Sequence, residues 1–307
     1  MHEDYFQIEA LSASGAKSLL VSPAQYRHER DNPRADTDDF RFGRLVHCLA
    51  LEPHKADEMA VLLPDRPDLS GVRDVKGNVP AMPQSTTEGK ALLAPWQARC
   101  DELRAIADAG ERYACTADQW AQVKADAQIV AAAILDVVNP DTGWTLRKLL
   151  NDSQAQAFVE QAITWNAQVG DDTCRCKARP DAVVSLPDGR VIVVDPKTTR
   201  SALTAADLSR TIATFGYHRQ AAHYLDALAS QGVVDAEFWF IFASKSAPFD
   251  ACWIKLAQNA LIVGANEMDT AKRIYAACTT AGVWPTAQTA GLLPTELDLP
   301  RWYRPEE

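Results

Sequence analysis

A predicted β-hairpin constrains the fold of this chain more than any other feature of its sequence. Two apolar segments, residues 174–185 and 190–199, flank the turn-forming sequence Leu-Pro-Asp-Gly at residues 186–189. Segments joined in this way by Pro, Asp and Gly are typical of two antiparallel strands. The run Val-Ile-Val-Val at residues 191–194 is apolar at every position, which indicates a strand buried on both faces. We therefore expect the core to form around this hairpin.

Polar residues lie near the ends of the hairpin strands, in the sequences Arg179-Pro180-Asp181 and Asp195-Pro196-Lys197. Residues i and i+2 of a strand point to the same face, so Asp195 and Lys197 are expected to project together. Carboxylate oxygens are ligands that Mg²⁺ prefers. A lysine beside a metal-bound water can help activate that water or stabilise charge on a phosphorane. The alternative for Asp-x-Lys taken alone is a surface ion pair, which contributes about 0–1 kcal/mol.

Two pairs of residues at helical i, i+4 spacing accompany the hairpin. Gly43 and His47 lie in one helical stretch, where Gly43 would let another backbone approach the face that carries His47. Gln220 and Tyr224 lie in a second helical stretch. Each pair taken alone fits a core role as well, because buried histidines and tyrosines are commonly satisfied by a partner inside the protein.

Taken in order along the chain, these features form the set G-x-x-x-H, Asp, D-x-K and Q-x-x-x-Y. The set resembles the PD-(D/E)xK nuclease superfamily, and within it the branch of RecB-type nucleases and RecE-like phage and prophage exonucleases of the exodeoxyribonuclease VIII type. The resemblance is weakest over residues 64–152. Near the two ends of the chain it is carried by residues 11–14, 22–26, 51–53, 271–275 and 284–285.

The resemblance implies an α/β, restriction-endonuclease-like core with a central mixed sheet flanked by helices, plus an N-terminal helical region. We expect residues 1–152 to form that helical region and to pack on a nuclease core at residues 153–307, the two making one compact unit. Helices are predicted at residues 12–21, 23–30, 38–51, 88–109, 116–138, 217–230 and 258–281. Strands are predicted at residues 156–165, 173–185, 190–199, 236–243 and 250–256, and residues 64–87 are predicted to be a loop.

The resemblance also implies a metal site. The family's two metal-binding acids fall on Asp181 and Asp195, where the chain has Asp195 in place of the commoner Glu. The main-chain carbonyl of Pro196 would be a further ligand, Lys197 the catalytic lysine, and His47 a residue at the metal. The implied metal is Mg²⁺, for which Mn²⁺ would substitute.

Further residues match the family's motifs for positioning DNA and the site. Gln220 and Tyr224 match the Q-x-x-x-Y motif, and Glu160 aligns loosely with an acidic residue that precedes the hairpin. Basic residues that would contact DNA gather near these motifs. They are Arg44, Arg179, Arg200, His218 and Arg219.

The implied activity is a Mg²⁺-dependent 5′→3′ exonuclease that degrades one strand of duplex DNA and leaves 3′ single-stranded tails for recombination. The resemblance further implies a ring-shaped homo-oligomer and a single-strand annealing partner of the RecT type. Two alternatives stay open at this stage. One is a structure-specific or restriction-like endonuclease on the same core, and the other is a catalytically idle DNA-binding module.

The formal net charge of −10 makes long-range attraction to DNA poor, so DNA binding would depend on local basic residues. No apolar run reaches the roughly 20 residues of a membrane span, and the first residues lack a signal-peptide pattern. These observations predict a cytoplasmic protein without a membrane partner.

Seven cysteines are scattered through the chain without a C-x-x-C pair. An odd number of cysteines without a secretory signal predicts reduced thiols. Some relatives with this nuclease core hold an iron–sulfur cluster on four cysteines around it. Only Cys278 follows the last predicted core strands here, so no such cluster is expected.

Overall fold

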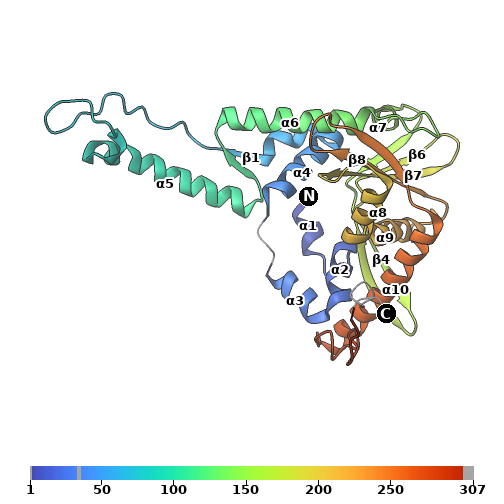
Figure 1. The fold of residues 1–307 in the computed structure, drawn as a ribbon. Helices are drawn as coiled ribbons and strands as arrows, with labels where there is room; N and C mark the ends of the chain where they lie inside the picture. The colour runs from blue at the N-terminus through green and yellow to red at the C-terminus, as the bar shows by residue number, and fades with distance from the viewer. Residues whose placement is uncertain (1, 33–35, 300–307) are drawn as a thin grey trace, which may run out of the picture. The chain divides into compact units, whose positions relative to one another are not determined.

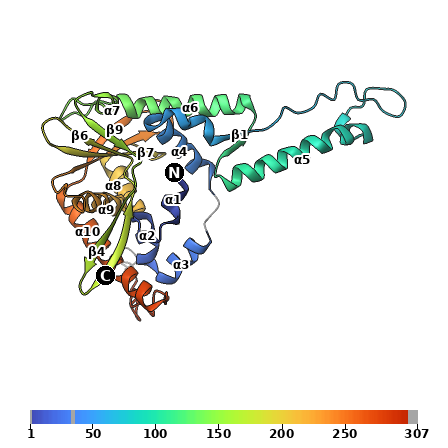
Figure 2. The ribbon, with the colours of Figure 1, turned by 180° about the vertical axis from the view of Figure 1, so that it is seen from behind.

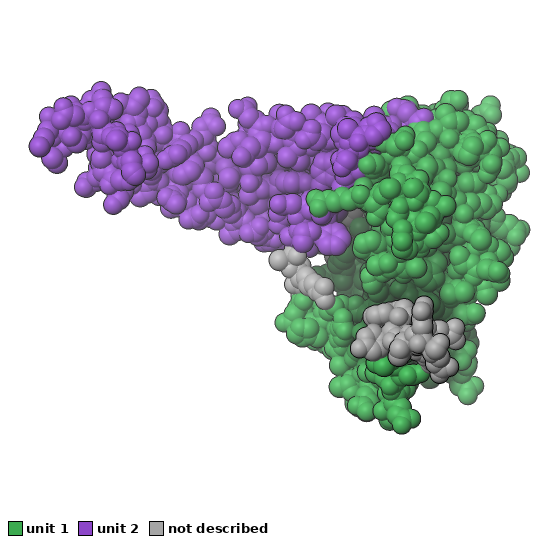
Figure 3. Space-filling view, viewed as in Figure 1, with its two compact units in different colours: residues 1–35, 137–244, 250–307 green, residues 36–136, 245–249 purple. Residues whose placement is uncertain are grey.

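The computed structural model describes residues 2–32 and 36–299, and the chain divides into two compact units (Figure 3). Unit 1 comprises residues 1–35, 137–244 and 250–307, and unit 2 comprises residues 36–136 and 245–249. This grouping differs from the expected division after residue 152. Residues 1–35 and 137–152 group with the later strands and helices, not with the helical residues between them.

A five-stranded mixed sheet forms the centre of unit 1 and confirms the predicted fold class. Its strand order is β3-β6-β7-β8-β9, in which β7 and β8 are parallel and the other neighbours antiparallel. The bounds are Gln156–Val159 for β3, Ala182–Ser185 for β6, Val191–Thr199 for β7, Glu237–Ser244 for β8 and Ala251–Lys255 for β9. The predicted hairpin is present as β6–β7, and β8 and β9 form a second antiparallel pair.

Two of the predicted strands are each divided into two shorter ones. The segment predicted at 156–165 breaks between β3 and β4 (Ile163–Val169), and the segment at 173–185 breaks between β5 (Asp172–Ala178) and β6. β4 and β5 pair with each other in a separate antiparallel sheet. The breaks coincide with Glu160, whose φ is 52°, and with Pro180, which has no amide hydrogen to donate. The Glu160 amide donates to the Asp181 carbonyl at 3.1 Å, so the two breaks lie side by side.

The helices of unit 1 are α1 (His2–Gln7), α2 (Ala13–Val21), α3 (Pro23–Asp31), α7 (Leu146–Asn151), α8 (Ala205–Phe215), α9 (Tyr217–Ala229) and α10 (Gln258–Ala281). Of these, α9 packs on both sheets and α10 packs on β4 and β5 (Figures 1 and 2). Three of these helices, α1, α7 and α8, were not predicted. The Thr204 side chain accepts from the Asp207 amide at the start of α8, and Gly216 ends that helix with a φ of 72°.

The aromatic residues of β8 fix α9 on one face of the five-stranded sheet. Phe238, Phe240 and Phe242 alternate along β8 and pack with Val193 of β7 and with Ala221 and Leu228 of α9. A second apolar cluster joins β4 and β5 to α2 and α10. Because Val193 and Asp195 lie two residues apart on β7, Asp195 points toward the same helix.

Unit 2 is mainly helical. Its elements are α4 (Asp38–Leu51), η1 (Pro53–Met59), β1 (Ala60–Leu62), η2 (Pro83–Ser85), α5 (Thr87–Ala109), β2 (Tyr113–Cys115) and α6 (Ala117–Asp136). β1 and β2 pair in parallel, and α4 packs on α6. Residues 63–82 form no helix or strand, in agreement with the predicted loop, and run out alongside α5 (Figure 1). In the described part of the chain, no helix has the length and apolar character needed to cross a membrane.

We predict that Gly264→Ala destabilises unit 1. A Cβ atom at Gly264 of α10 would lie 2.3 Å from the carbonyl oxygen of His218 in α9, and neither backbone can yield without moving its helix. We expect a loss of about 1–3 kcal/mol in the free energy of unfolding, measured by urea denaturation. Gly71→Ala is the control, because a Cβ there meets no atom within 4 Å and should change stability by less than about 0.5 kcal/mol. Equal stability of the two variants would contradict the close approach of α9 and α10.

Candidate active site

The predicted D-x-K motif lies where β7 continues past the end of its partner β6. Pairing between these strands ends at Ala182 and Val194, whereas pairing with β8 continues to Thr199. Pro196 is tolerated there because that edge of β7 no longer needs an amide donor. Extending the register by one residue places Asp181 opposite Asp195, and opposite residues of antiparallel strands share a face.

Asp195 is fully buried, and its carboxylate contacts three neighbouring side chains. The Gln220 side-chain amide donates to Oδ2 at 2.8 Å, and the Lys197 ammonium forms an ion pair with Oδ1. The carboxyl group of Asp181 also interacts with that of Asp195. The structure therefore brings together four of the residues singled out in the sequence.

Tyr224 is the fifth residue of this group. Its hydroxyl accepts a hydrogen bond from Gln220 at 3.1 Å, as expected for two residues one turn apart on α9. Burial, followed by the charges of Asp181 and Asp195, raises the pKa of Tyr224 well above its usual 10.0. The Tyr224 hydroxyl therefore keeps its proton at neutral pH and remains able to donate it in a hydrogen bond.

Lys197 is held as a cation between the two carboxylates. Burial by itself would lower its pKa, but the charges of Asp195 and Asp181 outweigh burial, and the net pKa is raised. The ammonium also lies 5.1 Å from the centre of the Tyr217 ring. Tyr217 was not among the predicted site residues, although its position three residues before Gln220 on the same helix places it on the helical face that carries Gln220.

Glu160 and Arg179 form an ion pair at the border of this site. Arg179 Nε lies 2.8 Å from Glu160 Oε2, and Glu160 occupies the left-handed backbone region next to Asp181. Non-glycine residues in that region are uncommon and cluster at functional sites. The Arg179 guanidinium also lies 5.0 Å from the centre of the Tyr5 ring in α1. Tyr5 was not predicted, because nothing local in the sequence indicates that α1 reaches β5.

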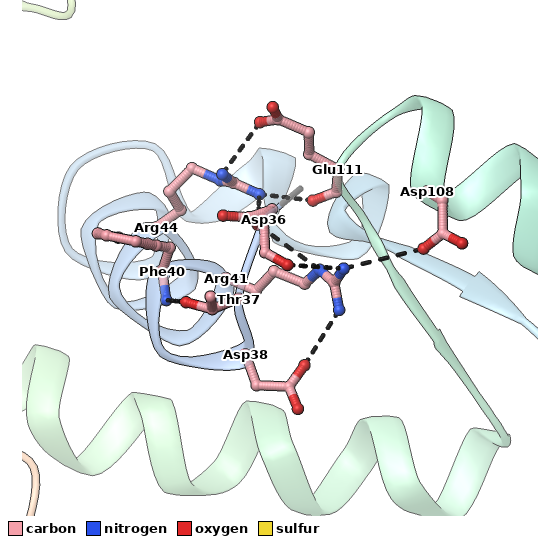
Figure 4. A network of polar contacts seen from close by, with 8 residues as sticks. All are labelled: Asp36, Thr37, Asp38, Phe40, Arg41, Arg44, Asp108 and Glu111. Carbon is pink, nitrogen blue, oxygen red and sulfur yellow. Dashed lines mark hydrogen bonds and ion pairs between the residues drawn. The ribbon is translucent and has the colours of Figure 1, made fainter. Parts of the chain in front are cut away.

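Arg44 of unit 2 lies in a network of acidic residues at the start of α4 (Figure 4). Its guanidinium contacts Asp36 Oδ2 at 2.6 Å and Glu111 Oε2 at 3.0 Å, and Arg41 contacts Asp36 as well. These contacts tie the first turn of α4 to the residues after α5. His47 follows one turn later in α4 and is partly buried. Roles for Arg44 at DNA and for His47 at the metal stay predictions.

The remaining basic candidates are on α9 and after β7. The side chains of His218 and Arg219 both contact Glu267 of α10, at 3.0 and 2.6 Å, and thereby join the two helices. Arg200 follows β7 directly and is exposed. Contacts of these residues with DNA also stay predictions.

The donor atoms of the site suit a hard divalent cation. Mg²⁺ is commonly held by one or two carboxylates while it keeps several waters, and Asp181 and Asp195 supply two buried carboxyl groups on one face. Within residues 2–32 and 36–299, no group of three or more His, Cys, Asp or Glu side chains is arranged to hold a metal. The carbonyl of Pro196 stays a predicted further ligand.

The titration of Asp181 gives a prediction about stability and pH. Burial raises the pKa of Asp181 from 3.8 to about 6, although the Lys197 charge lowers it. The folded protein thus holds this proton more tightly than the unfolded chain. The resulting stabilisation is present below about pH 4 and is lost as the pH rises to about 6.

In EDTA, we expect the free energy of unfolding to fall by up to about 3 kcal/mol across this interval because of Asp181. Asp181→Asn should show a correspondingly smaller fall, since an amide does not titrate. Urea denaturation at pH values from 4 to 7 measures both proteins. Parallel curves for the two would contradict the raised pKa.

Comparison with known proteins supports this fold. The crystal structure of a "Putative exonuclease" from Eubacterium rectale is similar over 93% of this chain and 86% of that chain, with a TM-score of 0.50 and 14% sequence identity. The structure of SSO0001 matches 41% of this chain and 54% of that chain at 17% identity, and its TM-score of 0.29 is too low to support an argument. The comparison with curated proteins finds no match.

A family model provides the stronger result. The model described as "PDDEXK-like domain of unknown function (DUF3799)" matches residues 12–291, which include both strand breaks and the five residues Asp181, Asp195, Lys197, Gln220 and Tyr224. A match of this length, together with the mixed sheet, points to a nuclease-type hydrolase. The chain therefore belongs to the family of PDDEXK-like domains of unknown function, within the PD-(D/E)xK nuclease superfamily.

Proposed function

We propose that this protein is a Mg²⁺-dependent DNA nuclease that hydrolyses phosphodiester bonds at the Asp181–Asp195 pair. The observation that carries the proposal is the arrangement at the end of β7. Two carboxyl groups face each other there, and Lys197 is ion-paired with Asp195. Two carboxylates and a partly buried lysine at an open strand edge suit the hydrolysis of a phosphate ester with a bound divalent cation.

Asp181, Asp195 and the carbonyl of Pro196 would hold the metal, with His47 as a further residue at the metal. Bound Mg²⁺ supplies a Lewis acid and lowers the pKa of water. Lys197 is placed to stabilise negative charge that develops on the phosphate oxygens. Gln220 keeps Asp195 in position through its 2.8 Å hydrogen bond, and Tyr224 supports Gln220.

The substrate and polarity rest on the resemblance to RecE-like exonucleases described above. We infer that the enzyme is RecE-like and degrades duplex DNA from 5′ ends, leaving 3′ tails for recombination. A ring of identical subunits, a RecT-type annealing partner and a cytoplasmic location belong to the same proposal. DNA would contact the predicted basic residues Arg44, Arg179, Arg200, His218 and Arg219.

Linear duplexes labelled at the 5′ or 3′ end test this proposal beside a covalently closed circle. With Mg²⁺, we expect early release of labelled mononucleotides from 5′ ends, slow loss of the 3′ label and an intact circle. EDTA should abolish all release. Cutting of the circle would show that the protein is an endonuclease and not an exonuclease. A lack of cleavage with Mg²⁺ or Mn²⁺ would overturn the proposal in favour of a DNA-binding module.

Two substitutions should separate metal binding from turnover. Asp195→Asn removes a ligand charge, so we expect its affinity for Mn²⁺ to fall at least tenfold and its nuclease activity to be lost. Lys197→Met should bind Mn²⁺ nearly as the parent does but lose about 10²–10³-fold in kcat, because the lysine acts on the phosphate and not on the metal. Calorimetric titration and initial rates measure the two effects.

Lys255→Met provides a matched control for Lys197→Met. Lys255 is a half-exposed lysine of β9, and its Nζ atom lies 2.8 Å from Glu237 Oε2, in an ion pair that does not include Asp181 or Asp195. We expect this variant to keep the parent's Mn²⁺ affinity and rate. Unchanged Mn²⁺ binding by Asp195→Asn would show that the metal site is assigned to the wrong residues.

A further inference from the structure

Two exposed phenylalanine rings lie next to tyrosines that border the site. Phe6 is 67% exposed and Phe215 is 53% exposed. The Phe6 ring meets Tyr5 edge to face with 5.6 Å between ring centres, and the Phe215 ring stacks on Tyr217 at the same distance with an angle of 20°. Tyr5 contacts Arg179 and Tyr217 contacts Lys197, so both pairs connect to residues of the site.

The Phe6 ring is held in place by the anchoring of α1. The buried ammonium of Lys177 donates to the carbonyls of Tyr5 and Ile8, each at 2.9 Å, and lies 4.7 Å from the centre of the Tyr5 ring. Leu11 then pairs with Cys176 at the edge of β5. These contacts fix the last turn of α1 against β5, and Phe6 is exposed from an anchored segment.

The Phe215 ring is held equally firmly. It is the last residue of α8, and the left-handed Gly216 turns the chain directly into α9. Tyr217, on which Phe215 stacks, packs against Phe240 and Phe242 of β8 at 5.6 and 6.1 Å between ring centres. The outer ring is therefore supported by the aromatic core of the sheet.

A cation accompanies each exposed ring. The Arg179 guanidinium lies 5.4 Å from the centre of the Phe6 ring, and the Lys17 ammonium lies 5.4 Å from the centre of the Phe215 ring. Single exposed apolar residues are ordinary on protein surfaces. An exposed ring with a cation over it has a more specific complement, because a nucleotide offers a base that packs on the exposed part of the ring and a phosphate that pairs with the cation.

We propose that Phe6 and Phe215 are base-stacking residues that hold unpaired nucleotides of a DNA strand next to the carboxylate pair. The proposal rests on the nuclease function and deepens it, since it assigns an unpaired strand as the form of DNA that enters the site. Tyr5 and Tyr217 act as the supports of the two rings. A duplex end would have to separate over a few nucleotides before its cleaved strand could occupy both positions.

Binding of a fluorescein-labelled twelve-residue thymidine oligonucleotide tests this assignment by fluorescence anisotropy, with Ca²⁺ in place of Mg²⁺. We expect Phe6→Ala and Phe215→Ala each to weaken binding by about 5- to 100-fold. Phe6→Trp should bind the oligonucleotide at least as tightly as the parent does, because the larger indole ring stacks on a base at least as well as a phenyl ring. Phe40→Ala, at a phenylalanine of unit 2 that is 65% exposed, is the matched control and should bind as the parent does.

An abasic oligonucleotide of the same length separates stacking from charge. The parent should bind it more weakly than the thymidine oligonucleotide, whereas the double variant Phe6→Ala/Phe215→Ala should bind the two alike. A double variant that keeps the parent's preference for bases would overturn the proposal. Failure of the proposed nuclease function would give a different result. The parent would still bind the thymidine oligonucleotide more tightly than the abasic one, but it would release no nucleotides from labelled DNA with Mg²⁺.

Discussion

The unequal lengths of β6 and β7 are the constraint on which the site depends. Pairing between them ends at Ala182 and Val194, so the next residue of each strand, Asp181 and Asp195, faces its counterpart at an open edge. The break before β6 is stabilised by Pro180 and by the left-handed Glu160, whose amide donates to the Asp181 carbonyl. A β6 strand two residues longer would cover that edge with backbone hydrogen bonds and leave no space for a metal or a phosphate.

The aromatic side chains of β8 determine the position of α9, the helix whose side chains contact Asp195 and Lys197. Phe238, Phe240 and Phe242 fill one face of the sheet and hold α9 against β7. With that helix in place, one helical face carries Gln220 and Tyr224 to Asp195, and the preceding turn carries Tyr217 to Lys197. The polar site is thus positioned by apolar packing, and the close contact of α10 with α9 at Gly264 adds to its rigidity.

Local sequence patterns predicted the parts of this site that follow from strand and helix periodicity. The spacing of Asp195 and Lys197 fixes their common face, and that of Gln220 and Tyr224 does the same on α9. The division of both long strands was not predictable in this way, because it depends on where pairing between distant segments ends. Helix α8 was missed although Thr204 and Asp207 form a readable capping pattern. Tyr5 reaches the site through tertiary contacts of α1 with Lys177 and Arg179.

The charges of the site explain why a divalent cation and DNA would bind together. Three carboxylates, those of Asp181, Asp195 and Glu160, stand against two cations, Lys197 and Arg179, in a chain with a formal net charge of −10. Without a metal, a phosphate would meet an excess of negative charge, and burial followed by the charge of Glu160 raises the pKa of Asp181 against the charge of Lys197. A divalent ion reverses the sign of this local charge. It would let Lys197 and Arg179 turn toward phosphate, so metal and DNA affinities in the proposed nuclease should rise together.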